Sequence, residues 1–105
     1  MSEVYKSFVI AGIEYYKALF VINEIKVGDK LILKTEPQNI HDENAVEIYY
    51  KDTKLGYIPR NANYSISKIM NAGWDIFEAY IQALDKNNLK IKVAVFLEER
   101  WLRKL

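Results

Sequence analysis

Three neighbouring side chains, His41, Asp42 and Glu43, are the most reactive group of residues in this sequence. An imidazole beside a carboxylate can act as an acid–base pair. No nucleophile is evident nearby, and the chain of 105 residues contains no cysteine and only one histidine. Glycine-rich phosphate loops, a G-x-S-x-G elbow and a histidine-containing zinc motif are also missing. The protein is therefore expected to be neither an enzyme nor the carrier of a metal or cofactor.

Aromatic residues suggest a different chemistry, that of stacking. Eight Tyr, four Phe and two Trp make up 13% of the chain. Aromatic rings fill hydrophobic cores, but their flat faces also serve as platforms for nucleic-acid bases. Fifteen basic against fourteen acidic residues give a net charge of only +1, which excludes a strongly basic nucleic-acid coat protein and leaves room for local basic patches.

The composition fits one folded domain spanning residues 1–105, with 50% hydrophobic and 28% charged residues. No segment reaches the roughly 20 apolar residues that cross a bilayer. Residues 1–7 lack the charged-then-apolar order of a signal peptide, so a cytoplasmic location without membrane contact is expected.

Most of the chain has the patterns of short strands. Leu31 and Leu33 alternate with Ile32 and Lys34, for example, which gives one apolar face. Strands are predicted over residues 4–11, 30–36, 45–51, 54–58, 76–84 and 89–97. Residues 13–22 are aromatic and β-branched, and they are predicted to be strand-prone or irregular rather than helical.

One helix is predicted to begin at Asn63 or Ser65 and to end at Gly73. The tail, residues 98–105, could add a second short helix. Residues 38–44 form a polar loop without periodicity, and Asp52-Thr53 and residues 85–88 are predicted hairpin turns. The fold class is mainly β, a small antiparallel barrel or sandwich with a helix covering one end.

Several short motifs occur in an order that identifies a known family. They are AGIEYY at 11–16, VGD at 27–29, EPQNIHDENAV at 36–46 and LGYIPR at 55–60. Together they resemble the HIRAN domain family, over residues 8–96. The resemblance implies an OB-like antiparallel β-barrel of about six strands with one or two covering α-helices. It also implies a module that captures the free 3′-hydroxyl end of single-stranded DNA, as family members attached to motors of replication-fork remodelling and DNA repair do. This chain resembles the stand-alone form.

The resemblance carries over to individual residues. Tyr15 matches the aromatic that stacks on the terminal base, and His41 stands where a second stacking aromatic is common. Asp42 matches the carboxylate that receives the 3′-hydroxyl proton, although an Asx turn is the alternative role for this residue. Tyr57 and Arg60 match positions that touch backbone phosphates.

Other positions are less decisive. Asn39 could belong to the site or hold the loop, Asn44 is expected to hold the loop, and Tyr16 is expected to pack. Lys34 and Lys54 could add to a basic rim, although a lysine on a strand edge more often prevents aggregation through that edge. Phe96 is expected to pack rather than line the pocket.

Glu14 replaces an arginine of a DNA-binding member, so binding of single-stranded DNA ends is expected to be weak. The alternative is a protein-interaction module that has lost the DNA pocket and docks on a DNA-processing partner through Tyr49, Trp74 or Trp101.

Overall fold

The computed structural model describes residues 3–98, which form one six-stranded sheet and three short helical elements. In chain order these are β1 (Val4–Val9), the 3₁₀ helix η1 (Ile13–Tyr15), α1 (Ala18–Val21), β2 (Lys30–Thr35), β3 (Val46–Tyr50), β4 (Thr53–Tyr57), α2 (Arg60–Asn71), β5 (Phe77–Asp85) and β6 (Lys90–Leu97). All six predicted strands are present, and none of their bounds differs from the prediction by more than two residues. No helix in the described residues has the length and apolar character needed to cross a membrane.

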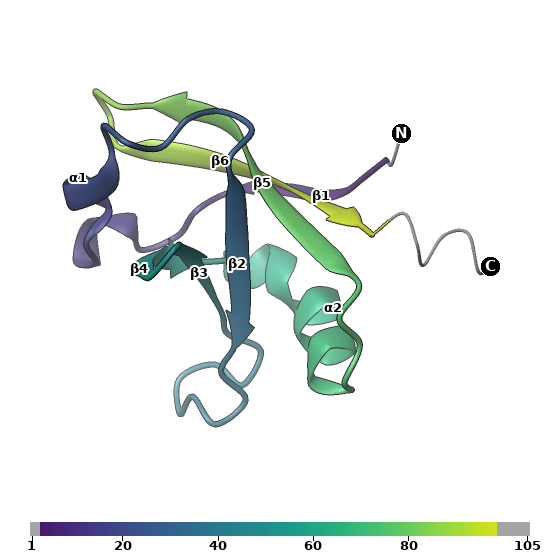
Figure 1. The fold of residues 1–105 in the computed structure, drawn as a ribbon. Helices are drawn as coiled ribbons and strands as arrows, with labels where there is room; N and C mark the ends of the chain where they lie inside the picture. The colour runs from purple at the N-terminus through teal and green to yellow at the C-terminus, as the bar shows by residue number, and fades with distance from the viewer. Residues whose placement is uncertain (1–2, 99–105) are drawn as a thin grey trace.

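The strands lie in the order β1-β6-β5-β2-β3-β4, and every neighbouring pair is antiparallel. The sheet curls, so that β1, β6 and β5 face β2, β3 and β4 across the interior (Figure 1). The fold is therefore mainly β and OB-like, a partly open barrel with helices beside it.

A short seam joins the two ends of the curled sheet. Ala11, just after β1, forms an isolated antiparallel bridge with Tyr57 at the end of β4. The Ala11 N–H donates to the Tyr57 carbonyl at 2.8 Å, and the Tyr57 N–H donates to the Ala11 carbonyl at 2.9 Å. Gly56 makes this close approach possible, because a Cβ built there would lie 2.4 Å from the Ala11 carbonyl oxygen. Its φ of +153° is also one that residues with side chains rarely adopt.

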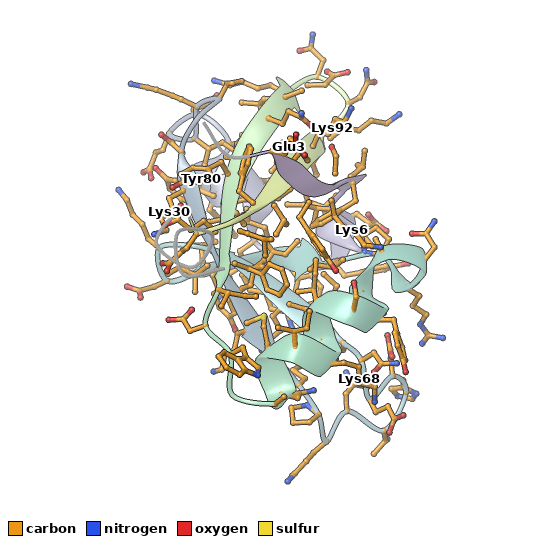
Figure 2. The ribbon with its side chains drawn as sticks, turned by 90° about the vertical axis from the view of Figure 1, so that its right-hand side faces the viewer. Glu3, Lys6, Lys30, Lys68, Tyr80 and Lys92 are labelled. Carbon is orange, nitrogen blue, oxygen red and sulfur yellow. The ribbon has the colours of Figure 1, made fainter. Side chains whose placement is uncertain are left out.

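The hydrophobic core fills the space inside the curl. Val93 and Val95 of β6, Ile48 of β3 and Leu55 of β4 have no exposed surface, and neither has Ile66 of α2. Burial alternates along β2 and the first half of β6, as the strand pattern predicts, whereas consecutive residues of β3 are buried. Lysine side chains such as Lys30, Lys68 and Lys92 lie at the periphery (Figure 2).

The prediction for residues 13–22 was wrong, because this segment contains η1 and α1. Gly12 adopts the left-handed conformation (φ 70°) and begins the first helical turn. Ala18, Val21 and Ile22 are then buried at helical spacing, while Leu19 and Phe20 remain exposed. Contact of these residues with the core therefore outweighs their β propensity.

The helix α2 begins earlier than predicted, at Arg60, directly after Pro59. Asn63 does not cap it, because its side chain is buried and donates to Asp42 instead. The predicted stop is confirmed, since α2 ends at Asn71 and Gly73 follows with a φ of +99°. Of the predicted tail helix, only Glu98 lies among the described residues, and it is in neither a helix nor a strand.

Candidate functional site

A cavity of about 340 Å³ lies at the seam of the barrel. Three chain segments meet there: the one that follows β1, the loop between β2 and β3, and the junction of β4 with α2. The lining residues are Ala11, Gly12, Tyr15, Tyr16, Asn39, His41, Asp42, Ala45, Tyr57, Ile58 and Arg60. All six residues proposed from the sequence, namely Tyr15, Asn39, His41, Asp42, Tyr57 and Arg60, therefore line one cavity.

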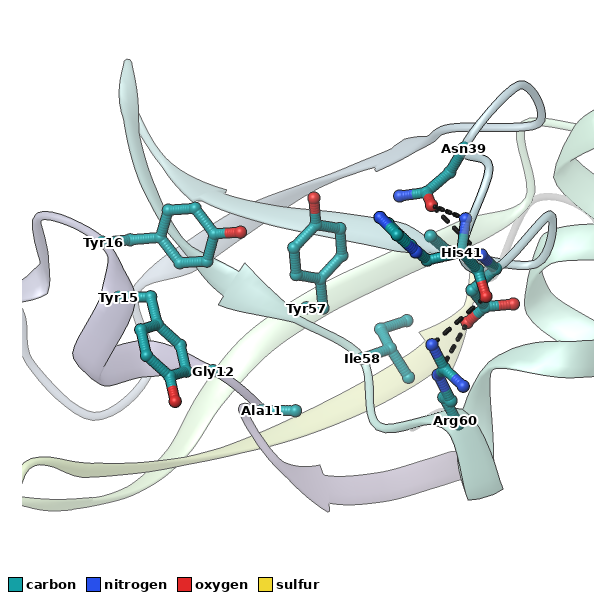
Figure 3. A pocket seen from close by; sticks show the side chains of 11 residues that line it. Ala11, Gly12, Tyr15, Tyr16, Asn39, His41, Tyr57, Ile58 and Arg60 are labelled. Atoms are coloured by element: carbon teal, nitrogen blue, oxygen red, sulfur yellow. Dashed lines mark hydrogen bonds and ion pairs between the residues drawn. The ribbon is translucent and has the colours of Figure 1, made fainter.

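Aromatic side chains form one end of this cavity. Tyr15 projects from η1 with 80% of its surface exposed. Tyr16 packs edge-on against Tyr57, with ring centroids 5.8 Å apart, so it packs as expected while also lining the cavity. Figure 3 shows the three tyrosine rings at this end and His41 and Arg60 at the other. The cavity thus offers one freely exposed ring, Tyr15, and two rings that support each other.

The Lys54 side chain contacts both of the supporting rings. Its Nζ lies 4.4 Å from the centroid of the Tyr16 ring and 4.2 Å from that of Tyr57. The same nitrogen donates to the Tyr57 hydroxyl at 2.8 Å and pairs with Glu47 at 3.0 Å. Burial disfavours the charge of Lys54, but these two partners outweigh it and raise its pKa above the ordinary value. Of the two roles considered for Lys54, a basic rim or an edge lysine, neither describes it fully, because its charge is paired with Glu47.

Two glutamates complete this polar network, and the sequence pattern did not reveal either. A charged residue that alternates with apolar ones on a strand suggests an exposed position, yet Glu47 is buried and accepts hydrogen bonds from both Lys54 and Tyr49. The Tyr57 hydroxyl donates to Glu36 at 2.8 Å, and the Asn39 amide donates to the same oxygen at 3.2 Å. The network therefore connects the aromatic end of the cavity to the loop that carries Asn39.

The pKa of Tyr57 makes this network testable by pH. Burial and the hydrogen bond to Glu36 raise the pKa of Tyr57 to about 12, against the opposing effect of Lys54. Folding therefore favours the neutral phenol. The stability that the Tyr57 phenol contributes is complete below pH 10 and is lost as the pH rises to about 12.

We expect Tyr57→Phe to lower the free energy of unfolding by about 1 kcal/mol at pH 8. The difference from the wild type should shrink between pH 10 and pH 12. Urea unfolding across this range measures both values. A difference that stays constant with pH would show that Tyr57 does not titrate as described.

The loop between β2 and β3 forms the opposite wall, and its own side chains hold its shape. Asn39 Oδ1 accepts from the backbone N–H groups of His41 (2.8 Å) and Asp42 (3.1 Å). Asn39 therefore acts in the loop, although it also lines the cavity. Asn44 was expected to hold the loop with its side chain, but only its backbone N–H takes part, donating to Asp42 Oδ1 at 2.9 Å. Its buried side-chain Oδ1 has no hydrogen-bond partner among the described residues.

The alternative role considered for Asp42, an Asx turn, is present in the structure. Its Oδ1 closes an Asx turn with Asn44, and its Oδ2 accepts from Asn63 of α2 at 2.9 Å. Arg60 Nε lies 3.7 Å from the same Oδ2, and Arg60 Nη2 donates to the His41 carbonyl at 3.2 Å. A carboxylate has about four acceptor positions, so Asp42 keeps capacity for a further donor. Its side chain is 19% exposed.

Other residues singled out in the sequence lie outside the cavity. Glu14 is exposed on η1 beside Tyr15 but does not line the cavity. Lys34 is exposed on β2 and does not line it either. Phe96 packs edge-on against Tyr80, as expected of a packing residue. Asn63 was missed as a partner of Asp42, because its position in the sequence suggested a helix cap.

The cavity combines the groups needed to hold the end of a nucleotide chain. It has exposed aromatic faces, a carboxylate with spare acceptor capacity and a guanidinium that is three-quarters exposed. Within residues 3–98, no group of three or more His, Cys, Asp or Glu side chains is placed to hold a metal ion.

Known proteins resemble this chain in sequence and in fold. The sequence profile of the HIRAN domain matches residues 5–100. No curated protein matches the sequence significantly. A crystal structure from Lactobacillus plantarum, determined by the Northeast Structural Genomics Consortium, superposes with a TM-score of 0.82 at 21% identity, covering 92% of this chain and 95% of that one. The HIRAN domain of human HLTF superposes with a TM-score of 0.66 at 17% identity, covering 94% and 82% respectively.

Proposed function

The chain belongs to the HIRAN domain family, which is known for nucleic-acid binding, and we propose that it binds the 3′-hydroxyl end of single-stranded DNA without catalysis. The observation that carries this proposal is the cavity at the seam. It brings together six residues from segments separated by up to 45 positions. Their side chains include rings that can stack on bases, a carboxylate that can accept from a hydroxyl and a guanidinium that can bind a phosphate.

Stacking provides the affinity. Tyr15 presents a ring with little contact to the rest of the protein, and a base can lie against it at little cost in protein rearrangement. Stacking of one base on an aromatic ring is typically worth about 1–3 kcal/mol. His41, at the far end of the cavity, offers a second and smaller ring (Figure 3).

The polar end of the cavity provides the preference for a 3′ end. A 3′-hydroxyl can donate to a free acceptor position of Asp42, while Arg60, 3.7 Å away, can turn its exposed guanidinium toward a phosphodiester. A 3′-phosphate would bring negative charge against the carboxylate. The preference for the hydroxyl therefore comes from Asp42.

Few cations are available for phosphate contacts. The net charge is +1, Lys54 is used internally and Glu14 lies beside the platform residue Tyr15. We therefore expect a dissociation constant in the micromolar range or weaker. The affinity should also depend only weakly on salt, because few phosphates are neutralised and each contributes only about 0.7 to the slope of log K against log salt.

Fluorescence anisotropy at low salt tests the proposal. Three labelled probes are compared: a single strand with a 3′-hydroxyl, the same strand with a 3′-phosphate, and a blunt duplex. We expect the free hydroxyl strand to bind most tightly. Equal or undetectable binding to all three would overturn the proposal.

The alternative, a protein-interaction module, is favoured by a different surface. Leu19 and Phe20 of α1 are 69% and 81% exposed, which is unusual for adjacent large apolar residues. The two described aromatics that were expected to mediate docking are not part of this surface, because Tyr49 lies on β3 and Trp74 follows α2. Trp101, the third, lies outside the described residues. Failure of DNA binding would direct attention to α1 as the docking surface for a DNA-processing partner.

Glu14→Arg is expected to strengthen single-strand binding about three- to tenfold at low salt, because it replaces repulsion of the phosphates by attraction. Anisotropy with the 3′-hydroxyl strand measures the change. Glu3→Arg is the matched control, with the same change of charge near the N-terminus, on the opposite side of the molecule from α1 (Figure 1). An equal gain in both variants would mean that Glu14 lies away from the path of the strand.

A further inference from the structure

A second cavity, also of about 340 Å³, adjoins the first and takes no part in the function proposed above. It lies between the segment that links η1 to α1 and the β3–β4 hairpin. Its lining residues are Tyr16, Lys17, Tyr49, Asp52, Thr53 and Lys54. Tyr16 lines both cavities and therefore lies at the boundary between them.

The direction of a bound strand follows from the first cavity. Arg60 and its partner Asp42 lie at one end, and Tyr15 and Tyr16 lie at the other (Figure 3). If Asp42 holds the terminal 3′-hydroxyl, the rest of the strand extends in the 5′ direction toward Tyr16. The second cavity is then the next concave surface that the strand meets.

The side chains of the second cavity suit a nucleotide. Lys17 is exposed and forms no ion pair with another described residue, so its charge is available for a phosphate. Tyr49 presents a half-buried ring whose hydroxyl is anchored to Glu47 at 2.9 Å. Aromatic rings beside cations are the usual lining of single-strand binding grooves. Asp52 opposes this arrangement, because its carboxylate repels phosphates.

We propose that the second cavity binds a nucleotide on the 5′ side of the strand end, with Lys17 at its phosphate and Tyr49 against its base. The inference rests on the proposed function and extends it: the protein reads the end of a strand in one cavity and the preceding chain in the next. The ligand is therefore an oligonucleotide rather than a mononucleotide.

Titration with thymidine 5′-monophosphate, dT2, dT3 and dT6, all with free 3′-hydroxyls, tests the inference by NMR spectroscopy of the ¹⁵N-labelled protein. Amide signals around the first cavity, such as Gly12, should respond to every ligand. The amide signals of Lys17 and Thr53 should respond only when the ligand is long enough to pass Tyr16. The dissociation constant should fall by about fivefold or more from the mononucleotide to dT6, since one phosphate contact and one stacked base are added.

Lys17→Gln should remove most of this gain, weakening dT6 by about fivefold, and should leave the mononucleotide unchanged. It should also reduce the salt slope for dT6 by about 0.7. Asp52→Asn should act in the opposite direction and strengthen dT6. The control is Lys92→Gln, which makes the same change of charge on β6, at a residue that lines neither cavity.

The outcomes separate the two proposals. If oligonucleotides bind with a preference for the 3′-hydroxyl but Lys17→Gln behaves like Lys92→Gln, the second subsite is wrong and end binding stands. If none of the ligands binds, end binding is wrong, and the inference that rests on it is overturned as well.

Discussion

Replacing Gly56 with alanine is expected to lower the free energy of unfolding by about 3 kcal/mol, through the combined cost of an unfavourable φ and an overpacked contact. The new Cβ would lie 2.4 Å from the Ala11 carbonyl oxygen and 2.7 Å from Ile10 Cγ2. The backbone carbonyl of Ala11 cannot rotate away as the end of a flexible side chain can, so the seam must open to make room. Urea denaturation followed by tryptophan fluorescence measures the loss.

Gly73→Ala is the matched control. Gly73 also has a positive φ (+99°), but an added Cβ would meet nothing within 4 Å. This variant should therefore lose only about 1–2 kcal/mol, the cost of the backbone conformation alone. Gly56→Ala should in addition weaken ligand binding, because the seam joins the walls of the first cavity. An equal loss of stability in the two variants would show that close approach at the seam is not what requires glycine at position 56.

Asp42→Asn is expected to abolish discrimination between 3′-hydroxyl and 3′-phosphate ends. In the wild type, repulsion between the carboxylate and the added phosphate should give a preference of about tenfold or more for the hydroxyl, since the side chain is largely shielded from water. The neutral amide removes this repulsion, so the two ends should bind within about twofold of each other. Anisotropy with the paired oligonucleotides measures the ratio.

Asparagine is preferable to alanine in this experiment, because Asp42 also holds its loop. The amide oxygen of asparagine can still accept from the Asn44 N–H, which keeps the turn, whereas alanine would remove the turn. With the oxygen placed there, the new NH2 group faces the buried Asn63 amide, which then has to rotate and present its oxygen as acceptor. Glu43→Gln, which neutralises the adjacent exposed carboxylate outside the cavity, is the control. Selectivity that survives in Asp42→Asn would remove Asp42 from the recognition of strand ends.

The strands could be predicted because their burial follows local alternation, as in β2 and β6. Residues 13–22 could not, because the burial of Ala18 and Val21 depends on contacts with distant parts of the chain. The start of α2 was missed for a similar reason: Asn63 looks like a cap, and only the fold brings it to Asp42.

The membership of the candidate site was predictable from the order of its motifs, but the bonding of its residues was not. Asp42 both closes the turn and lines the cavity, and no local sequence pattern reveals this combination. Burial of Glu47 likewise depends on its pairing with Lys54 across the β3–β4 hairpin and on the phenol of Tyr49. Charged residues on a strand suggest a solvent-exposed face unless the partner is known.

The seam has a thermodynamic consequence for the whole molecule. The β5–β6 ladder aligns eight residue pairs, whereas Ala11 and Tyr57 close the barrel with one pair. Local unfolding should therefore begin at this junction, where the least structure has to be broken. A ligand that touches both walls of the first cavity stabilises the closed form by mass action. Closure of the barrel and occupancy of the cavity are thus linked equilibria, in which each favours the other.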